Sequence, residues 1–193
     1  MNDPRMVFAY ADPPYLGQSH RYPEHPEAHI WDDPQTHQQL IDRLVNEYPN
    51  GWLMSASSSS LHTILPMCPP DVRVLAWVKT FAAFKKHVNP AYSWEPIIMF
   101  GGRPRTDAMT YMRDWVAQPI TLKKGLTGAK PKPVVRWMFD ALNAQVGDTL
   151  DDLFPGTGIV SHTWDEYMGD YAAHASKINR VSSGWEMGKG AQR

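Results

Sequence analysis

Two consecutive prolines end the first apolar segment of the chain a few residues from its start. Residues 7–10 (VFAY) are typical of the end of a short buried strand, and Asp12 is followed by Pro13 and Pro14. Proline donates no backbone hydrogen bond and disfavours a helical conformation in the residue before it. The chain must therefore leave the sheet in a rigid turn, with Asp12 at the carboxyl end of the strand. In α/β sheets this end presents the reactive groups.

The turn Asp12-Pro13-Pro14-Tyr15 carries groups that suit an extruded adenine or cytosine. A carboxylate and the Pro13 carbonyl can each accept one hydrogen from an exocyclic amine, which leaves the nitrogen lone pair free to attack. The Tyr15 ring offers a flat surface on which a base can stack, a contact that contributes roughly 1–3 kcal/mol. Taken alone, the tetrapeptide is equally consistent with an ordinary turn that caps a helix.

Length and composition predict one folded domain. The chain has 193 residues, of which 42% are hydrophobic, and this is enough for a sizeable core. We find no apolar stretch of about 18 residues and no basic-then-apolar leader, so we expect a cytoplasmic protein with no membrane partner. The single cysteine, Cys68, has no neighbouring lysine or histidine to activate it and is interpreted as structural.

Positive charge is concentrated in one part of a nearly neutral chain. Residues 103–136 contain eight cations against Asp107 and Asp114. Such a segment favours contact with a polyanion, although a solvated loop is the alternative. The cations are Arg103, Arg105, Arg113, Lys123, Lys124, Lys130, Lys132 and Arg136.

Three histidines lie in the polar, proline-rich segment 18–33. Their spacing matches no ligand pattern, and Pro23 and Pro26 break any helix that would align them. We therefore predict no metal site there and interpret the segment as a mobile lid over the site.

The remaining pattern alternates strands and helices. Asp33-Pro34 predicts a helix start, and further strands are predicted at 51–56, 72–78 and 93–100. Pro96 inside the last of these predicts a sheet edge or a bulge. A second long helix is predicted after residues 130–133.

A strand, a glycine loop and a helix follow one another near the end of the chain. Residues 149–154 (TLDDLF) predict the strand, 155–158 (PGTG) the loop, and the helix extends to Met168. This arrangement lets the backbone approach a ligand closely at a helix N-terminus. Residues 148–170 hold six carboxylates and no lysine or arginine, which favours a cationic ligand such as a sulfonium over a phosphate.

With these motifs in this order, the chain resembles the amino-methyltransferases that methylate adenine N6 or cytosine N4 in DNA with S-adenosylmethionine. It resembles in particular the permuted type, in which the catalytic motif precedes the cofactor motif. The resemblance covers residues 5 to about 168 and rests on 12–15, on Lys132-Pro133 and on 152–158. Small members of this type are typical of bacteriophages, which would place the protein in the host cytoplasm.

The resemblance implies a role for each matching residue. Asp12, Pro13, Pro14 and Tyr15 would form the catalytic motif, with Tyr15 stacked on the flipped base. The cofactor would be bound by Lys132, Pro133, Asp152, Phe154, Gly156 and Gly158. Double-stranded DNA would be the substrate, adenine N6 the favoured target, and the segment 101–129 the target-recognition segment with Arg103, Arg105, Arg113, Lys123 and Lys124 on DNA.

The chain departs from this family after the glycine loop. Members continue into a strand whose terminal acid binds the cofactor ribose, and residues 169–193 predict only a polar tail. We therefore expect a Rossmann-like α/β methyltransferase sheet with helices on both faces, truncated to about five strands. In this single domain a catalytic half (1–100) and a cofactor-binding half (130–168) flank the recognition segment. Asp165, Glu166, Asp170 or a second subunit of a homodimer would complete the ribose site. A degenerate protein that binds DNA or a partner without turnover is the alternative.

Overall fold

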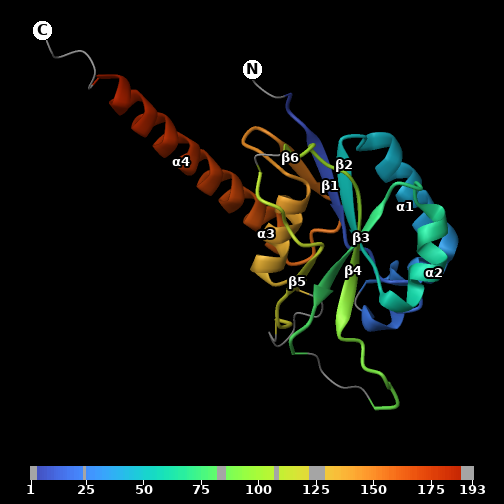
Figure 1. Ribbon diagram of the computed structural model, residues 1–193. Helices are drawn as coiled ribbons and strands as arrows, with labels where there is room; N and C mark the ends of the chain where they lie inside the picture. The colour runs from blue at the N-terminus through green and yellow to red at the C-terminus, as the bar shows by residue number, and fades with distance from the viewer. Residues whose placement is uncertain (1–3, 24, 82–85, 107–108, 122–128, 188–193) are drawn as a thin grey trace, which may run out of the picture.

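The computed structural model describes residues 4–23, 25–81, 86–106, 109–121 and 129–187, with side chains described as far as residue 173. Its centre is a six-stranded mixed sheet with helices on both faces (Figure 1). The sheet has the order β5-β3-β4-β2-β1-β6. Its strands are β1 (Val7–Ala11), β2 (Gly51–Ser55), β3 (Arg73–Val78), β4 (Trp94–Gly101), β5 (Trp115–Ala117) and β6 (Thr149–Asp152).

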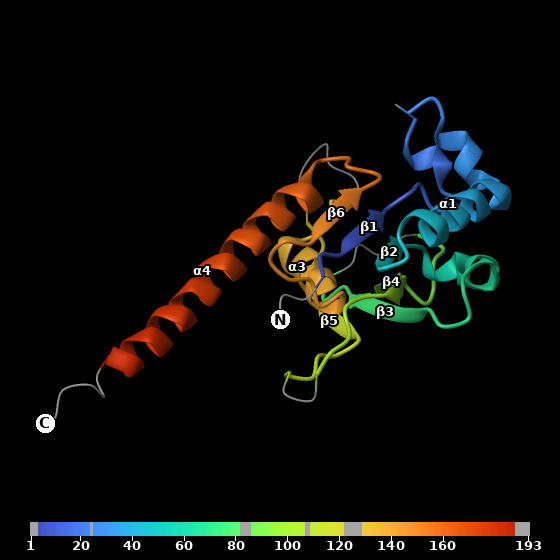
Figure 2. The same cartoon turned by 90° about the horizontal axis from the view of Figure 1, so that it is seen from above.

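The helices form the outer two layers of the fold. Helices α3 and α4 cover one face of the sheet, and α1 and α2 cover the other (Figures 1 and 2). Their bounds are α1 (Pro34–Glu47), α2 (Leu61–Ile64), α3 (Lys132–Ala141) and α4 (Ile159–Met187). Short 3-10 helices lie at η1 (Ser19–Arg21), η2 (Ala28–Asp32), η3 (Ser58–Ser60) and η4 (Leu65–Met67). None of the helices described in the structure is both long and apolar enough to cross a membrane.

Strand β1 contributes to the core on both faces of the sheet. Phe8 and Tyr10 belong to the cluster under α3 and α4, and Ala9 and Ala11 to the cluster under α1 and α2. Side chains alternate along a strand, so burial on both faces requires a continuous apolar run, and residues 8–11 provide one. Each large side chain buried in this way contributes roughly 1.5–3 kcal/mol.

Helix α1 begins where the sequence predicts. The Asp33 carboxylate accepts a hydrogen bond from the Gln35 N–H at 2.9 Å, and Pro34 occupies the first turn, where its missing N–H is not needed. Leu40, Ile41 and Leu44 are buried on one face of the helix. The cap and the apolar face together fix the position of α1 against β1 and β2.

The sheet differs from the prediction in two ways. It has six strands, not about five, because β5 forms inside the segment predicted to recognise DNA. Strand β4 lies in the sheet interior between β3 and β2, so the edge position predicted from Pro96 is wrong. The Pro96 carbonyl accepts from the Ala56 N–H at 3.1 Å, just beyond the end of β2. The missing proline donor therefore falls where the ladder with β2 ends, and it costs little.

Helix α4 is longer than the sequence predicts. It continues from Ile159 to Met187, through Gly169 and the first part of the segment predicted as a tail. Its distal part extends away from the sheet in both views (Figures 1 and 2). In the described part of the chain no strand follows α4, so β6 remains an edge strand with β1 as its neighbour.

Candidate active site

The proline turn at residues 12–15 and the glycine loop at residues 155–158 lie side by side at the carboxyl ends of β1 and β6. Strands β1 and β6 are parallel, with Tyr10 paired with Asp152, and the Leu153 N–H donates to the Tyr10 carbonyl at 2.9 Å. Asp12 follows β1 directly, and the glycine loop follows β6 directly. Segments from opposite ends of the chain, at residues 12–15 and 155–158, thus lie side by side.

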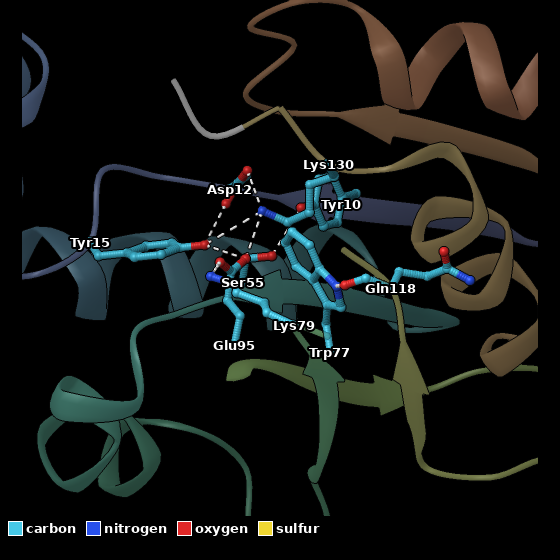
Figure 3. Close-up of polar contacts among 9 residues, drawn as sticks. All are labelled: Tyr10, Asp12, Tyr15, Ser55, Trp77, Lys79, Glu95, Gln118 and Lys130. Atoms are coloured by element: carbon cyan, nitrogen blue, oxygen red, sulfur yellow. Dashed lines mark hydrogen bonds and ion pairs between the residues drawn. The ribbon is translucent and has the colours of Figure 1, made fainter. Parts of the chain in front are cut away.

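Strand direction brings further polar residues to the same edge. Strand β3 is antiparallel to β4, which is antiparallel to β2, so β3 runs in the same direction as β1. Lys79, just after β3, therefore lies at the edge that bears Asp12. Strand β4 runs the opposite way, so its second residue, Glu95, lies there too. Figure 3 shows these side chains converging with Tyr15 and Lys130.

The Asp12 carboxylate lies between a lysine and a tyrosine. Lys130 Nζ donates to Asp12 Oδ2 at 2.7 Å, and the Tyr15 hydroxyl donates to Asp12 Oδ1 at 3.1 Å. The Lys130 side chain is 3% exposed, whereas that of Asp12 is 24% exposed. A carboxylate has about four lone-pair positions, so two contacts leave room for a further donor on the open side.

Glu95 connects Lys130 to a second lysine. Glu95 Oε1 lies 3.0 Å from Lys130 Nζ and accepts from the Tyr15 hydroxyl at 2.8 Å. Its other oxygen accepts from Lys79 Nζ at 3.0 Å, and that ammonium lies 4.9 Å from the centre of the Trp77 ring. Lys79, Glu95, Lys130 and Asp12 thus form a row of alternating charge, which we call the charge chain.

Burial and charge shift the titration of these groups in different directions. Burial raises the pKa of Asp12 above its ordinary value, and Lys130 opposes this. Burial also acts to raise the pKa of Glu95, but the ammonium groups of Lys130 and Lys79 outweigh it and bring it to about 2. Burial acts to lower the pKa of Lys130, yet Asp12 and Glu95 raise it well above its ordinary value. The pair Glu95–Lys130 is therefore charged at neutral pH, and of the two carboxylates that contact Lys130, Asp12 is the more easily protonated.

In the turn at residues 12–15, hydrogen bonds to the hydroxyl group fix the position of the Tyr15 ring. Burial, followed by the charges of Asp12 and Glu95, raises the pKa of Tyr15, so its hydroxyl stays a donor to both. Pro13 is buried and Pro14 is half-buried. The Tyr10 hydroxyl, on β1, and Ser55 Oγ, on the neighbouring strand β2, share a hydrogen bond at 2.9 Å (Figure 3). These contacts fix the turn rigidly against the sheet.

The glycine loop has the features of a ligand-binding loop. Asp152 Oδ2 accepts from Ser161 at 3.2 Å, but the buried Oδ1 has no partner among the described residues. Burial raises the pKa of Asp152. Gly156 (φ +46°) and Gly158 (φ +72°) both have left-handed backbones, and a Cβ at Gly158 would meet nothing within 4 Å. An unpartnered acceptor beside open backbone fits a cationic amino group, as S-adenosylmethionine carries.

The predicted contact of Lys132 with the cofactor stays a prediction. Lys132, at the start of α3 beside Pro133, pairs with Glu166 of α4 at 2.5 Å. Glu166 also contacts His162, and Asp170 pairs with Arg136 at 2.9 Å. Two of the three carboxylates proposed to complete a ribose site thus have partners on α3. These ion pairs connect α3 to α4.

The segment predicted as a lid packs against the glycine loop. The Trp31 ring meets the half-buried Phe154 ring edge-on, with centroids 5.2 Å apart, and also meets His37. Tyr22 lies close enough to Asp12 for that carboxylate to raise its pKa, after burial. Residues 18–33 therefore lie beside both motifs, and their proposed movement stays a prediction.

The structure places one of the five predicted DNA contacts, Arg103, in the interior of the fold. The Arg103 side chain is 4% exposed, and it donates to Asp148 Oδ1 at 2.7 Å and to the Pro4 carbonyl at 3.1 Å. A guanidinium buried in this way holds the fold together and is not presented to a phosphate. Arg105 and Arg113 are exposed, and Arg113 lies 5.1 Å from the Trp115 ring centre. Lys123 and Lys124 lie outside the described residues.

Cys68 has the surroundings of a structural thiol. Burial raises the pKa of this thiol to about 11, and its Sγ contacts the Ile64 carbonyl at 3.5 Å, so little thiolate forms at neutral pH. Among the described residues, no group of three or more histidine, cysteine, aspartate or glutamate side chains is arranged to bind a metal ion.

Sequence reasoning missed Lys79, Glu95 and Lys130 as site residues. The available signal was positional, because Lys79 directly follows a predicted strand and Glu95 lies near the start of another. Placing Lys79 and Glu95 in the site requires the directions of β3 and β4 relative to β1, and the sequence does not specify them. Lys130 was counted among the surface cations, and only the path of the chain into α3 brings it under Asp12.

Comparisons with known proteins agree with this fold. No protein-family profile matches the sequence, and no curated protein matches it. Among solved structures, the chain is similar to M1.HpyAVI in complex with SAM, with 15% identity and a TM-score of 0.59 over 85% of this chain and 79% of that one. For a second crystal structure of M1.HpyAVI the identity is 13% and the TM-score 0.52, over 85% of this chain and 77% of that one.

A third solved structure is TTHA0409, a candidate DNA modification methylase from Thermus thermophilus complexed with S-adenosyl-L-methionine. Its identity to this chain is 17% and the TM-score is 0.44, over 79% of this chain and 74% of that one. The similarity to the two M1.HpyAVI structures is one of fold alone. The chain has the Rossmann-like methyltransferase fold.

Proposed function

We propose that this protein methylates an exocyclic amino group in DNA with S-adenosylmethionine, and that adenine N6 is the favoured target. The observation that carries the proposal is the pairing of Tyr10 with Asp152, which brings Asp12 and the glycine loop to neighbouring positions. The resemblance of residues 12–15 to the signature of amino-methyltransferases supports the reaction type. The SAM complex of M1.HpyAVI, a protein of the same fold, supports the cofactor.

The residues of the site have distinct roles in this reaction. The open side of the Asp12 carboxylate and the Pro13 carbonyl accept the two amine hydrogens, so that the nitrogen lone pair is directed toward the glycine loop. Tyr15 stacks on the extruded base. Asp152 Oδ1 would accept from the ammonium of the cofactor. The protein backbone at Gly156 and Gly158 would leave space for the cofactor, and Lys132-Pro133 would border its methionine part. When bound, the cofactor supplies an electrophilic methyl carbon on a sulfonium leaving group.

The direct test is mass spectrometry of nucleosides from duplex DNA incubated with the protein and isotope-labelled S-adenosylmethionine. We expect labelled N6-methyldeoxyadenosine. Labelled N4-methyldeoxycytidine would change the target base but retain the reaction. Absence of any labelled nucleoside, with a known methyltransferase active in parallel, would overturn the proposal.

A second candidate function is that of a methyltransferase-like protein that binds without turnover. Two observations favour it: Asp12 is already engaged by Lys130 and Tyr15, and in the described part of the chain no strand follows α4 to complete a ribose site.

Cofactor binding separates the two candidates. In isothermal titration calorimetry we expect measurable affinity for S-adenosylmethionine, lost in Gly156→Trp because the indole fills the space above the loop. Gly17→Ala is the matched control, since Gly17 also has a left-handed backbone (φ +74°) and open space but lies outside the loop. No heat at millimolar ligand, with or without DNA, favours the second candidate.

We propose that DNA contacts the face formed by β5 and the segment before it. Arg105 and Arg113 are exposed there, and Tyr111 is 94% exposed. Because phosphate contacts release counterions, affinity for duplex DNA should fall steeply with salt, and Arg113→Gln should reduce the slope by about one. Arg43→Gln on α1 is the control. An unchanged slope in Arg113→Gln would remove this face from the proposal.

A further inference from the structure

Lys130, in the charge chain, is buried, so contact with a ligand at the protein surface does not explain its position. The Lys130 side chain is 3% exposed, and its Nζ lies 2.7 Å from Asp12 Oδ2 and 3.0 Å from Glu95 Oε1. A buried ammonium is costly unless its partners are close and charged, and both partners here are. Because Lys79 holds the far oxygen of Glu95, Glu95 is itself fixed, and it fixes Lys130 in turn.

We propose that Lys130 is a positioning residue that keeps the Asp12 carboxylate ionised and in one orientation, with its open side toward the target amine. This inference rests on the proposed function. Lys130 is too buried to meet a base directly, so it acts through Asp12, which is more exposed. Glu95 has the opposite electrostatic effect on Asp12 and serves to hold Lys130 and the Tyr15 hydroxyl in place.

The physical reason lies in two carboxylates that share one buried region. The Tyr15 hydroxyl donates to both Asp12 and Glu95, so the two acids lie within one hydrogen-bonding group of each other. Like charges at such separation force one acid to keep its proton unless a cation lies between them. Lys130 is that cation. A protonated Asp12 would turn one acceptor into a donor, and the amine would lose a partner.

Several other groups face Asp12 and belong to its electrostatic surroundings. Asp152 lies on the neighbouring strand, and its titration is affected by Asp12. Tyr10, on β1, and Tyr22, in the segment beside the site, also interact with Asp12 and have raised pKa values, so both stay uncharged near neutral pH. Among the described residues, the charged groups that act on Asp12 are Lys130 and Glu95, and Lys79 lies on the far side of Glu95.

The test is the pH dependence of the single-turnover rate of methyl transfer, measured at saturating cofactor and DNA. In the wild type, the rate should fall as the pH drops through the pKa of Asp12. In Lys130→Met, this acid limb should move to higher pH by roughly 1–3 units, the range by which a neighbouring cation shifts a carboxylate. In Glu95→Gln the limb should move to lower pH, because a like charge is removed. The double variant should lie between the two.

Opposite shifts are the decisive result. A lysine with a merely structural role would lower the rate equally at all pH values, and that outcome overturns the inference. If Lys130→Met does not fold, Glu95→Gln carries the test alone, since Lys130 then keeps Asp12 as partner. Arg43→Met, which breaks an exposed pair on α1, should leave the profile unchanged. An inactive wild type would refute the proposed function, whereas an active wild type with unshifted variants would refute only the role of Lys130.

Discussion

Asp12→Asn should lower the methyl-transfer rate by roughly 100-fold or more while the protein stays folded. Asparagine keeps one acceptor oxygen, and Lys130 needs that oxygen because its ammonium is buried at 2.7 Å from Asp12. The amide NH₂ then faces the open side, where it opposes the hydrogens of the target amine. The rate is measured in a single turnover with labelled cofactor, and the fold by far-UV circular dichroism.

Two comparisons make this result specific. Asp42→Asn, which changes an exposed carboxylate on α1, should keep the wild-type rate. Cofactor affinity in Asp12→Asn should stay close to that of the wild type, because Asp152 and the glycine loop are unchanged. Full turnover by Asp12→Asn would refute the role assigned to Asp12, and lost cofactor affinity would place Asp12 in the binding of the methyl donor instead.

Arg103→Met should reduce the free energy of unfolding by about 3–5 kcal/mol. The change removes the guanidinium that lies 2.7 Å from Asp148 Oδ1 and leaves that carboxylate buried, with a side chain only 1% exposed. The Asp148 oxygens also accept from the backbone N–H groups of Met6 and Gln145, so Arg103 stabilises the junction from which β1 and β6 start. Urea unfolding followed by tryptophan fluorescence measures the loss.

Arg43→Met is the matched control for stability. Arg43 pairs with Glu47 on the outside of α1, where both side chains are 52% exposed, so its loss should cost less than about 1 kcal/mol. Equal effects in the two variants would show that the buried pair stabilises no more than a surface pair. A loss of DNA affinity in folded Arg103→Met, without loss of stability, would restore Arg103 to the DNA-binding residues.

The sequence predicts the helices and the motif-bearing strands because these signals are local. Asp33-Pro34 caps α1, the apolar run at 8–11 forms β1, and residues 155–158 connect β6 to α4, all within a few residues of where they were predicted. The glycine loop at 155–158 and the proline turn at 12–15 were recognisable for the same reason. Each consists of consecutive residues whose backbone limits, from proline or glycine, can be read directly.

What the sequence does not predict depends on how distant segments pair. The sequence predicts a sheet edge at Pro96 because no residue near it in the chain reveals the actual pairing. The Pro96 carbonyl pairs with Ala56, just beyond the end of β2. Arg103 was assigned to DNA because nothing near it in sequence reveals Asp148. Helix α4 extends past Gly169 although glycine lowers helix propensity, since a single glycine costs only about 1 kcal/mol against a long helix.

The site is built from strand ends that are far apart in the sequence, so it can form only after the whole sheet has folded. Asp12 and Lys130 are 118 residues apart in the chain, and Tyr15 and Glu95 are 80 apart. A fragment that ends before Lys130 would carry the complete proline turn but not the cation that pairs with Asp12. Such non-local contacts form late in folding, so a nascent or proteolysed chain should have no partially working version of this centre. Activity should therefore report the integrity of the whole domain.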